Sequence, residues 1–213
     1  MMRPAALLRD FARDEEGLAL VEFAFVAPIL LTLILGGLEL ANYAIVHMKV
    51  NQIAMTVADN AGRVPTGIDE ANIHEVFAGA GVMGKGLDFQ THGRVVLSSV
   101  QDNGKTDSNR GQMINWQRCW GNLAVDPMYG EQGDGKTSDS MKDGVGADGR
   151  KIMAAKDSAV MLVEVSYTYQ PLIDTNYMII NGNIRHESAF NVRGRTNNDI
   201  TNAQDLQVMD CDD

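Results

Sequence analysis

The sequence has few of the residues that nucleic-acid binding and metal binding require. Its 213 residues include 18 Lys and Arg against 28 Asp and Glu, a formal net charge of −10, and no basic cluster that could bind nucleic-acid phosphates. The two cysteines, Cys119 and Cys211, lie far apart without the paired spacing of a zinc site, and the four histidines are scattered. We therefore expect neither nucleic acid nor a metal ion as a partner.

Catalytic motifs are also absent from the sequence. It contains no Gly-x-Ser-x-Gly nucleophile elbow, no P-loop and no His-Glu-x-x-His pattern. Asp134, Asp139, Asp143 and Asp148 could suggest calcium, but their spacing does not match the alternating ligands of an EF-hand. The prediction is a protein that is not an enzyme, with no catalytic residue and no cofactor.

A long apolar segment near the N-terminus is the most informative part of the chain. Residues 18–38 are apolar except for Glu22, Thr32 and a few helix-weakening residues, among them Pro28. As a helix rising about 1.5 Å per residue, this segment can cross a hydrocarbon core of about 30 Å. Pro28 lacks the N–H that would bond the carbonyl of Ala24, so we expect a kink or local loosening there.

The helical pattern continues past this segment and predicts one helix over residues 18–62. The apolar stripe on the second half of this helix must be buried, either by the protein's own sheet or by neighbouring subunits, and both can apply. Met48 and Met55 are interpreted as core filler. The apolar residues that recur at intervals of three and four are Tyr43, Val46, Val50, Ile53, Val57 and Ala61.

The residues before the apolar segment differ from a secretory signal peptide. Residues 1–17 are charged and end in Gly17, whereas a secretory signal places its apolar region before the cleavage site. Arginines in this leader favour a cytoplasmic N-terminus and an extracytoplasmic remainder.

Glu22 is the residue in this helix that most needs an explanation. A charged side chain inside an apolar span costs about 2.5 to 3.5 kcal/mol on insertion scales, so it usually has a partner or a function. The candidate function is assembly with other subunits.

The rest of the chain predicts one small domain, residues 63–193, followed by a polar tail, 194–213. A short amphipathic helix over 68–82 ends at a group of glycines, and strands are expected over 89–100, 113–120, 161–169 and 184–193. The strand 161–169 alternates between an apolar and a mostly polar face, and Glu164 on the polar face is expected to be solvated. Residues 121–150 form a long loop, suited to contact or variation.

Cys119 and Cys211 could form a disulfide that anchors the tail if the domain lies outside the cytoplasm. The alternative is two free thiols.

Gly17, followed by an apolar helix with Glu22 at its fifth position, resembles the processing site of type IV pilin-like proteins. Val21-Glu22-Phe23-Ala24 with Pro28 resembles the TadE-like family of Tad pilus pseudopilins, and Val163-Glu164-Val165-Ser166-Tyr167 is similar to a later family pattern. The resemblance implies a membrane-held precursor that a prepilin peptidase cuts between Gly17 and Leu18, and a role as a minor subunit of a pilus or its base.

The resemblance also implies partners and a location. These are other pilins or pseudopilins, the prepilin peptidase, the Tad inner-membrane assembly machinery and membrane lipid. The expected location is the inner (cytoplasmic) membrane, crossed once by about residues 18–38, with later incorporation into a cell-surface pilus that serves secretion, adhesion and surface colonisation.

The predicted fold class is therefore α+β: a long N-terminal membrane-spanning pilin-like helix packed on a small antiparallel β-sheet domain. The alternative function is an uncleaved, membrane-anchored extracytoplasmic binding or sensor module, in which the helix is only an anchor.

Overall fold

The computed structural model describes residues 16–173, 182–195 and 197–212. The chain divides into two compact units, one made of residues 1–43 with 171–180 and the other of residues 44–170 with 181–213. The predicted leader lies outside the described residues except for its last two positions.

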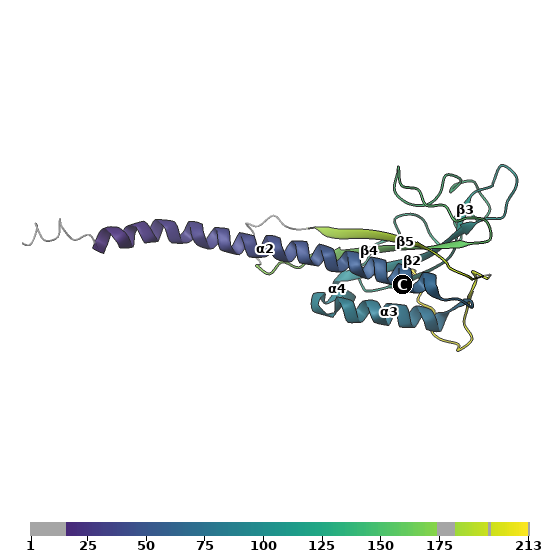
Figure 1. Cartoon of the computed structure of the whole chain (residues 1–213), viewed down its shortest axis with the longest axis horizontal. Helices are drawn as coiled ribbons and strands as arrows, with labels where there is room; N and C mark the ends of the chain where they lie inside the picture. Colours follow the sequence, from purple (N-terminus) through teal and green to yellow (C-terminus); the bar gives the residue numbers. More distant parts are fainter. Residues whose placement is uncertain (1–15, 174–181, 196, 213) are drawn as a thin grey trace, which may run out of the picture. The chain divides into compact units, whose positions relative to one another are not determined.

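Helix α2, Glu16–Arg63, is one continuous helix of 48 residues that contributes to both units (Figure 1). In the first unit, its large apolar side chains between Leu18 and Leu38 are 41% to 73% exposed. In the second unit, one side of the helix is buried. The residues of this buried stripe are Val46, Val50, Ile53, Ala54, Val57, Ala58 and Ala61.

Met48 and Met55 do not fill the core, so that interpretation is wrong. They are 58% and 47% exposed. Both lie about half a helical turn away from the buried stripe, because 3.6 residues make one turn. The sequence pattern placed the stripe correctly, and the methionines fall on the opposite side of it.

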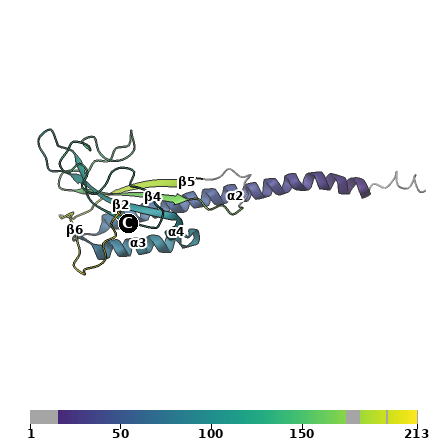
Figure 2. The same ribbon diagram turned by 180° about the vertical axis from the view of Figure 1, so that it is seen from behind.

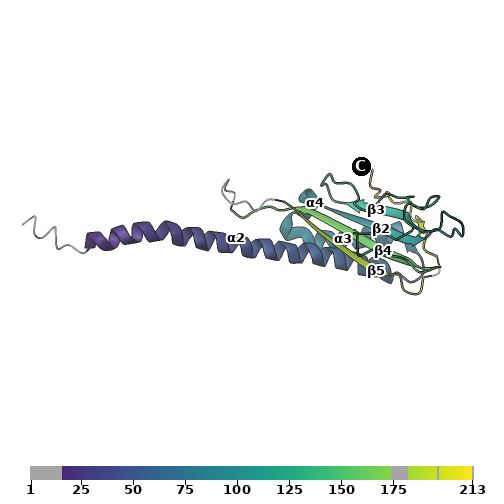
Figure 3. The same cartoon turned by 90° about the horizontal axis from the view of Figure 1, so that it is seen from above.

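Four antiparallel strands form the main sheet of the second unit, in the order β3-β2-β4-β5 (Figure 3). Their bounds are Gly93–Asp102 for β2, Gln112–Trp120 for β3, Ala159–Thr168 for β4 and Asn183–Asn191 for β5. A long apolar helix with an antiparallel sheet confirms the predicted α+β fold class.

Helix α3, Glu70–Gly84, packs on the same side of the sheet as the buried stripe of α2 (Figure 1). It ends at Gly84, two residues past the predicted end at residue 82 and within the expected group of glycines. Two of the glycines make room for aromatic residues: a Cβ at Gly81 would lie 3.3 Å from the Trp120 ring, and one at Gly84 would lie 2.5 Å from the Phe89 Cβ. Two glycines at this end of the helix therefore also allow close packing of the aromatic rings.

Phe89 begins a helical turn and not the expected strand. After the 3₁₀ turn η1, Lys85–Leu87, the short helix α4 covers Phe89–His92, and β2 starts only at Gly93. The Phe89 ring is buried and stacks between Trp120 and Tyr167, at centroid distances of 5.9 and 5.8 Å. Aromatic burial decided the local structure against the β-branched pattern that follows.

The segment between β3 and β4 covers the other face of the sheet, where we had expected a loop for surface contact. Met141, Val145 and Ala154 from this segment are buried against apolar residues of the strands. They form a second core with Val100, Ile114, Val160 and Leu162. This packing explains why β4 is buried on both faces up to Val165, and it corrects the expectation of a solvated face around Glu164.

The C-terminal tail is held at several points along its length. Strand β6, Ile200–Thr201, pairs in parallel with β1, Ile68–Asp69 (Figure 2). Further on, the Cys119 N–H donates to the Met209 carbonyl at 2.8 Å, and Cys119 and Cys211 are joined by a disulfide. The tail thereby covers part of edge strand β3, which would otherwise present unpaired backbone groups.

The disulfide generates the first prediction. Thiol labelling of the folded, non-reduced protein should modify neither cysteine, and both should react after reduction. Because the bond closes a separation of 92 residues, its loss should lower the free energy of unfolding by about 4 to 5 kcal/mol in the chain-entropy model. The double variant Cys119→Ser, Cys211→Ser separates loss of the bond from the reactivity of a single free thiol. Two labelled thiols in the non-reduced protein would contradict the pairing.

Candidate functional site

The predicted processing and assembly residues lie in the first three turns of α2. Gly17 faces open space, since a Cβ built there would meet no atom within 4 Å. Leu18 is 62% exposed, and Glu22 lies one helical turn further along, also exposed. Among the described residues, the Glu22 carboxylate has no hydrogen-bond or ion-pair partner. These positions are thus accessible, and their roles stay predictions.

Pro28 lies inside α2 without ending it. The helix assignment continues through this residue, and the Thr32 hydroxyl donates a hydrogen bond of 2.8 Å to the Pro28 carbonyl oxygen. Bonds of this kind from a Thr side chain to the carbonyl four residues earlier often accompany bending of a helix. The kink at Pro28 stays a prediction.

By length and composition, α2 can cross a membrane. It is the one such helix among the described residues, and its most apolar window contains no buried residue. The exposed apolar surface of residues 18–38 is therefore left for lipid or for other proteins to cover.

Glu39 is a buried carboxylate that the sequence reasoning missed. It follows the apolar segment directly and has no exposed surface. Its Oε2 accepts hydrogen bonds from the backbone N–H groups of Leu172 and Ile173, at 3.1 and 3.2 Å. The signal was present in the sequence, because an acid at the end of an apolar segment needs a partner, but the partner lies 133 residues away.

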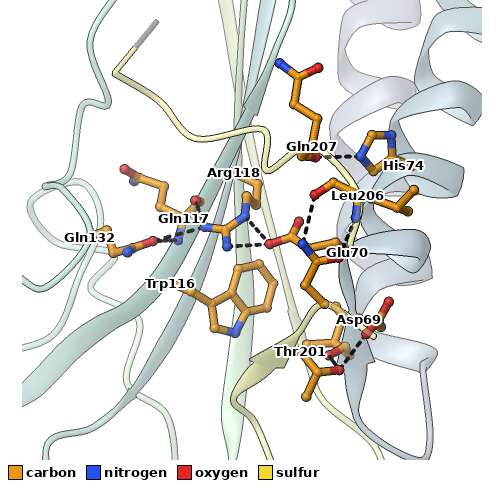
Figure 4. A network of polar contacts seen from close by, with 12 residues as sticks. Asp69, Glu70, His74, Trp116, Gln117, Arg118, Gln132, Thr201, Leu206 and Gln207 are labelled. Atoms are coloured by element: carbon orange, nitrogen blue, oxygen red, sulfur yellow. Dashed lines mark hydrogen bonds and ion pairs between the residues drawn. The ribbon is translucent and has the colours of Figure 1, made fainter. Parts of the chain in front are cut away.

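A buried ion pair joins α3 to edge strand β3 (Figure 4). Arg118 Nε donates to Glu70 Oε1 at 2.8 Å, and the side chains are 8% and 2% exposed. Arg118 Nη1 also donates to the carbonyl of Gln117 and to Oε1 of Gln132, so the guanidinium is bonded on several sides. Because removal of one partner from such a pair leaves an uncompensated buried charge, the pair fixes how α3 and the sheet fit together.

The same region ties down the tail (Figure 4). Asp69 caps α3 through the Ala71 N–H, and its carboxylate also accepts from the Thr201 hydroxyl at 2.7 Å. The bond from Thr201, with those from Ala203 and Ala71, lowers the pKa of Asp69. The His74 ring lies 2.8 Å from the Gln207 carbonyl oxygen. These hydrogen bonds join α3 to the C-terminal tail, so the network stabilises the fold.

Glu164 lines an open cleft that is bordered by β4, β5, the covering segment and Asn51 of α2. It is only 7% exposed, and its Oε2 accepts the Met128 N–H at 2.7 Å. Glu164 lies on β4, and its cross-strand neighbour on β5 is a second acid, Glu187. Glu187 accepts a short hydrogen bond from the Tyr129 hydroxyl and forms an ion pair of 3.2 Å with Arg150. Two acids directly opposite each other on one face disfavour double ionisation.

Burial raises the pKa of Glu164 to about 7, and the neighbouring Glu187 charge raises it further. The N–H groups of Met128 and Tyr129 and the charge of Arg185 act in the opposite direction and lower this pKa. Burial and the bond to Glu187 likewise raise the pKa of the Tyr129 hydroxyl to about 12. Glu164 can therefore exchange a proton near neutral pH while holding the backbone of the covering segment.

The described residues contain no group of three or more His, Cys, Asp or Glu side chains arranged to hold a metal ion. Cys119 and Cys211 are bonded to each other, which leaves no free thiol in the described part of the chain. The polar clusters act within the fold, and the accessible candidate positions are those at the start of α2.

Comparison with known proteins gives one match, confined to this helix. The model of the family described as TadE-like protein matches residues 17–59. Searches of the curated proteins and of the solved structures found no match. The family match confirms the resemblance seen in the N-terminal helix and begins at Gly17, whereas the similarity noted at residues 163–167 lies outside the matched range.

Glu164 generates the second prediction. Its pKa in the folded state, about 7, exceeds the ordinary value of 4.5. The folded state thus stays protonated at Glu164 to higher pH, and the contribution of Glu164 to the free energy of unfolding should fall by about 3 kcal/mol as the pH rises from 4.5 to 7.5. Glu164→Gln should remove this loss, so the variant should be more stable than the wild type at pH 8 and equal to it near pH 4.5.

The measurement is chemical denaturation of the full chain in detergent micelles across this pH range. Glu131→Gln, the same change at an exposed residue, is the matched control and should leave the pH profile unaltered. A difference in stability between the wild type and Glu164→Gln that does not change between pH 4.5 and 7.5 would refute the role of Glu164.

Proposed function

We propose that this chain is a minor pseudopilin of a Tad pilus, a membrane-held precursor that a prepilin peptidase cuts between Gly17 and Leu18. The observation that carries the proposal is the difference in side-chain exposure between the two parts of α2. The large apolar side chains of residues 18–38 are 41% to 73% exposed, whereas Val50, Ile53, Ala54 and Ala58 have no exposed surface. A helix that is covered over one part only needs an external cover for the other part.

Two coverings are proposed for the exposed part, at two stages. Before assembly it is the hydrocarbon of the inner membrane, which a segment of this length spans. After processing it is the helices of other pilins, brought together by the Tad assembly machinery. The family match at residues 17–59 includes this whole segment, which supports an association with pilus components.

The proposed orientation places the N-terminus in the cytoplasm and the sheet domain outside. Arg3, Arg9 and Arg13 precede the apolar segment, and positive residues accumulate on the cytoplasmic side of membrane helices. The disulfide between Cys119 and Cys211 supports the same orientation, because such bonds persist in oxidising compartments. Adhesion and surface colonisation would follow from the pilus as a whole.

Glu22 is the proposed register device. After cleavage, the new amine of Leu18 lies one helical turn from the Glu22 carboxylate, on the same side of the helix. A carboxylate that meets the amine of a neighbouring subunit recovers part of the free energy lost when it entered the bilayer. The axial offset between subunits is then fixed by the pairing.

The third prediction is that the mature protein begins at Leu18, as determined by mass spectrometry of the protein recovered from cells. Gly17→Val should block cleavage by crowding the peptidase site. Gly37→Val is the matched control, because a Cβ at either glycine meets no atom within 4 Å; this variant should be cut normally. An intact Met1 or Met2 terminus on the wild-type protein would remove this proposal and favour the uncleaved binding or sensor module.

The fourth prediction separates the charge of Glu22 from its shape. Glu22→Ala and Glu22→Gln should both still be inserted and cut, because the peptidase site is unaltered. Neither should cofractionate with partner pilins, because the carboxylate that would pair with an amine is gone. Normal assembly of both variants would show that Glu22 does not set the register.

A further inference from the structure

We propose that the turn after β4, residues 171–173, lies at the membrane surface, where it contacts the boundary between headgroups and hydrocarbon. This inference rests on the proposed membrane anchoring by α2. It adds a second point at which the chain touches lipid, distant in sequence from the first.

The first step is the position of Glu39 along α2. Residues 18–38 already span about 30 Å at 1.5 Å per residue, which is the thickness of the hydrocarbon core. Glu39 is the next residue, and Leu38 and Leu40 on either side of it are 56% and 61% exposed. The Glu39 backbone therefore lies where the span meets the headgroups.

The second step is the attachment of the turn to this point. The Glu39 carboxylate accepts the N–H groups of Leu172 and Ile173 at 3.1 and 3.2 Å. Both hydrogen bonds lie inside one compact unit, which contains residues 1–43 and 171–180. The turn is thus held at the depth of Glu39. The two bonds also explain how a buried carboxylate is tolerated at the edge of the hydrocarbon, since its charge is met by backbone donors.

The third step is what the turn presents. Leu172 is 67% exposed, although it is large and apolar. Pro171 precedes it and adds no backbone donor that would need water or a partner. Apart from Glu39, residues 38–43 and 171–173 contain no charged side chain. Exposed leucines without charges at this depth suit lipid, because the interface accepts apolar groups close to the hydrocarbon.

The experiment places an environment-sensitive fluorophore on single cysteines of the full chain in lipid vesicles. The variants are Leu172→Cys for the turn, Ile34→Cys for the span and Met153→Cys as an exposed control. Met153 is 57% exposed, comparable to Leu172. The native cysteines are bonded to each other and do not compete for the label.

Quenching by nitroxides attached near the lipid headgroups should be at least threefold stronger at position 172 than at 153. Iodide in the water should show the reverse order. Adding Glu39→Gln to the Leu172→Cys variant should reduce the lipid quenching at 172 by at least half, because a neutral amide holds the two N–H groups more weakly.

The outcomes distinguish the inference from the function on which it rests. A label at 34 that is quenched by lipid, with a label at 172 that behaves like 153, overturns the inference alone. A label at 34 that is open to iodide overturns the membrane anchoring and the inference with it. Protection at 172 that appears only when other pilins are added means that a protein covers the turn, and this also overturns the lipid contact.

Discussion

The domain depends on the burial of one side of α2 between Val46 and Ala61. Full burial of each Val or Ile in this stripe contributes about 1.5 to 3 kcal/mol. The end of the stripe is held by hydrogen bonds from the segment that follows β5: the Arg193 N–H donates to the Gly62 carbonyl, and the Arg195 side chain donates to the Ala61 carbonyl. Because α2 is continuous, the same helix also contains the apolar residues 18–38. Their apolar side chains are not buried by the domain, so lipid or other proteins must cover them.

The remaining elements cover the other surfaces of the sheet on which this stripe packs. The segment between β3 and β4 closes the second face, and the tail with its disulfide covers part of edge strand β3. The buried pair of Glu70 and Arg118 fixes α3 beside them. A domain closed in this way leaves the apolar surface of α2 as the part suited to lipid and to other subunits, which fits a subunit that is first held in a membrane and then assembled.

Local pattern was enough to predict the long helix, its buried stripe and all four strands of the main sheet in outline. It failed where contacts distant in sequence decide the outcome. Glu164 was expected in solvent because its strand alternates, but the covering segment buries it. Glu39 drew no prediction, since its partners at 172 and 173 lie far along the chain. The contacts of Gly81 with Trp120 and of Gly84 with Phe89 drew no prediction, because they depend on how the folded elements pack. Glu22 was singled out by its charge within an apolar span, and the resemblance added Gly17 and Leu18; the roles proposed for all three involve partners outside this chain.

The central claim is that the exposed apolar part of α2 is covered by other pilin-like subunits after assembly. A photo-crosslinking amino acid at Leu31, which is 57% exposed, tests it in cells that assemble pili. We expect adducts with another membrane-held pilin subunit that disappear when the assembly machinery is removed, leaving only lipid adducts. Lipid adducts alone, in cells with intact pili that contain the labelled chain, would contradict it.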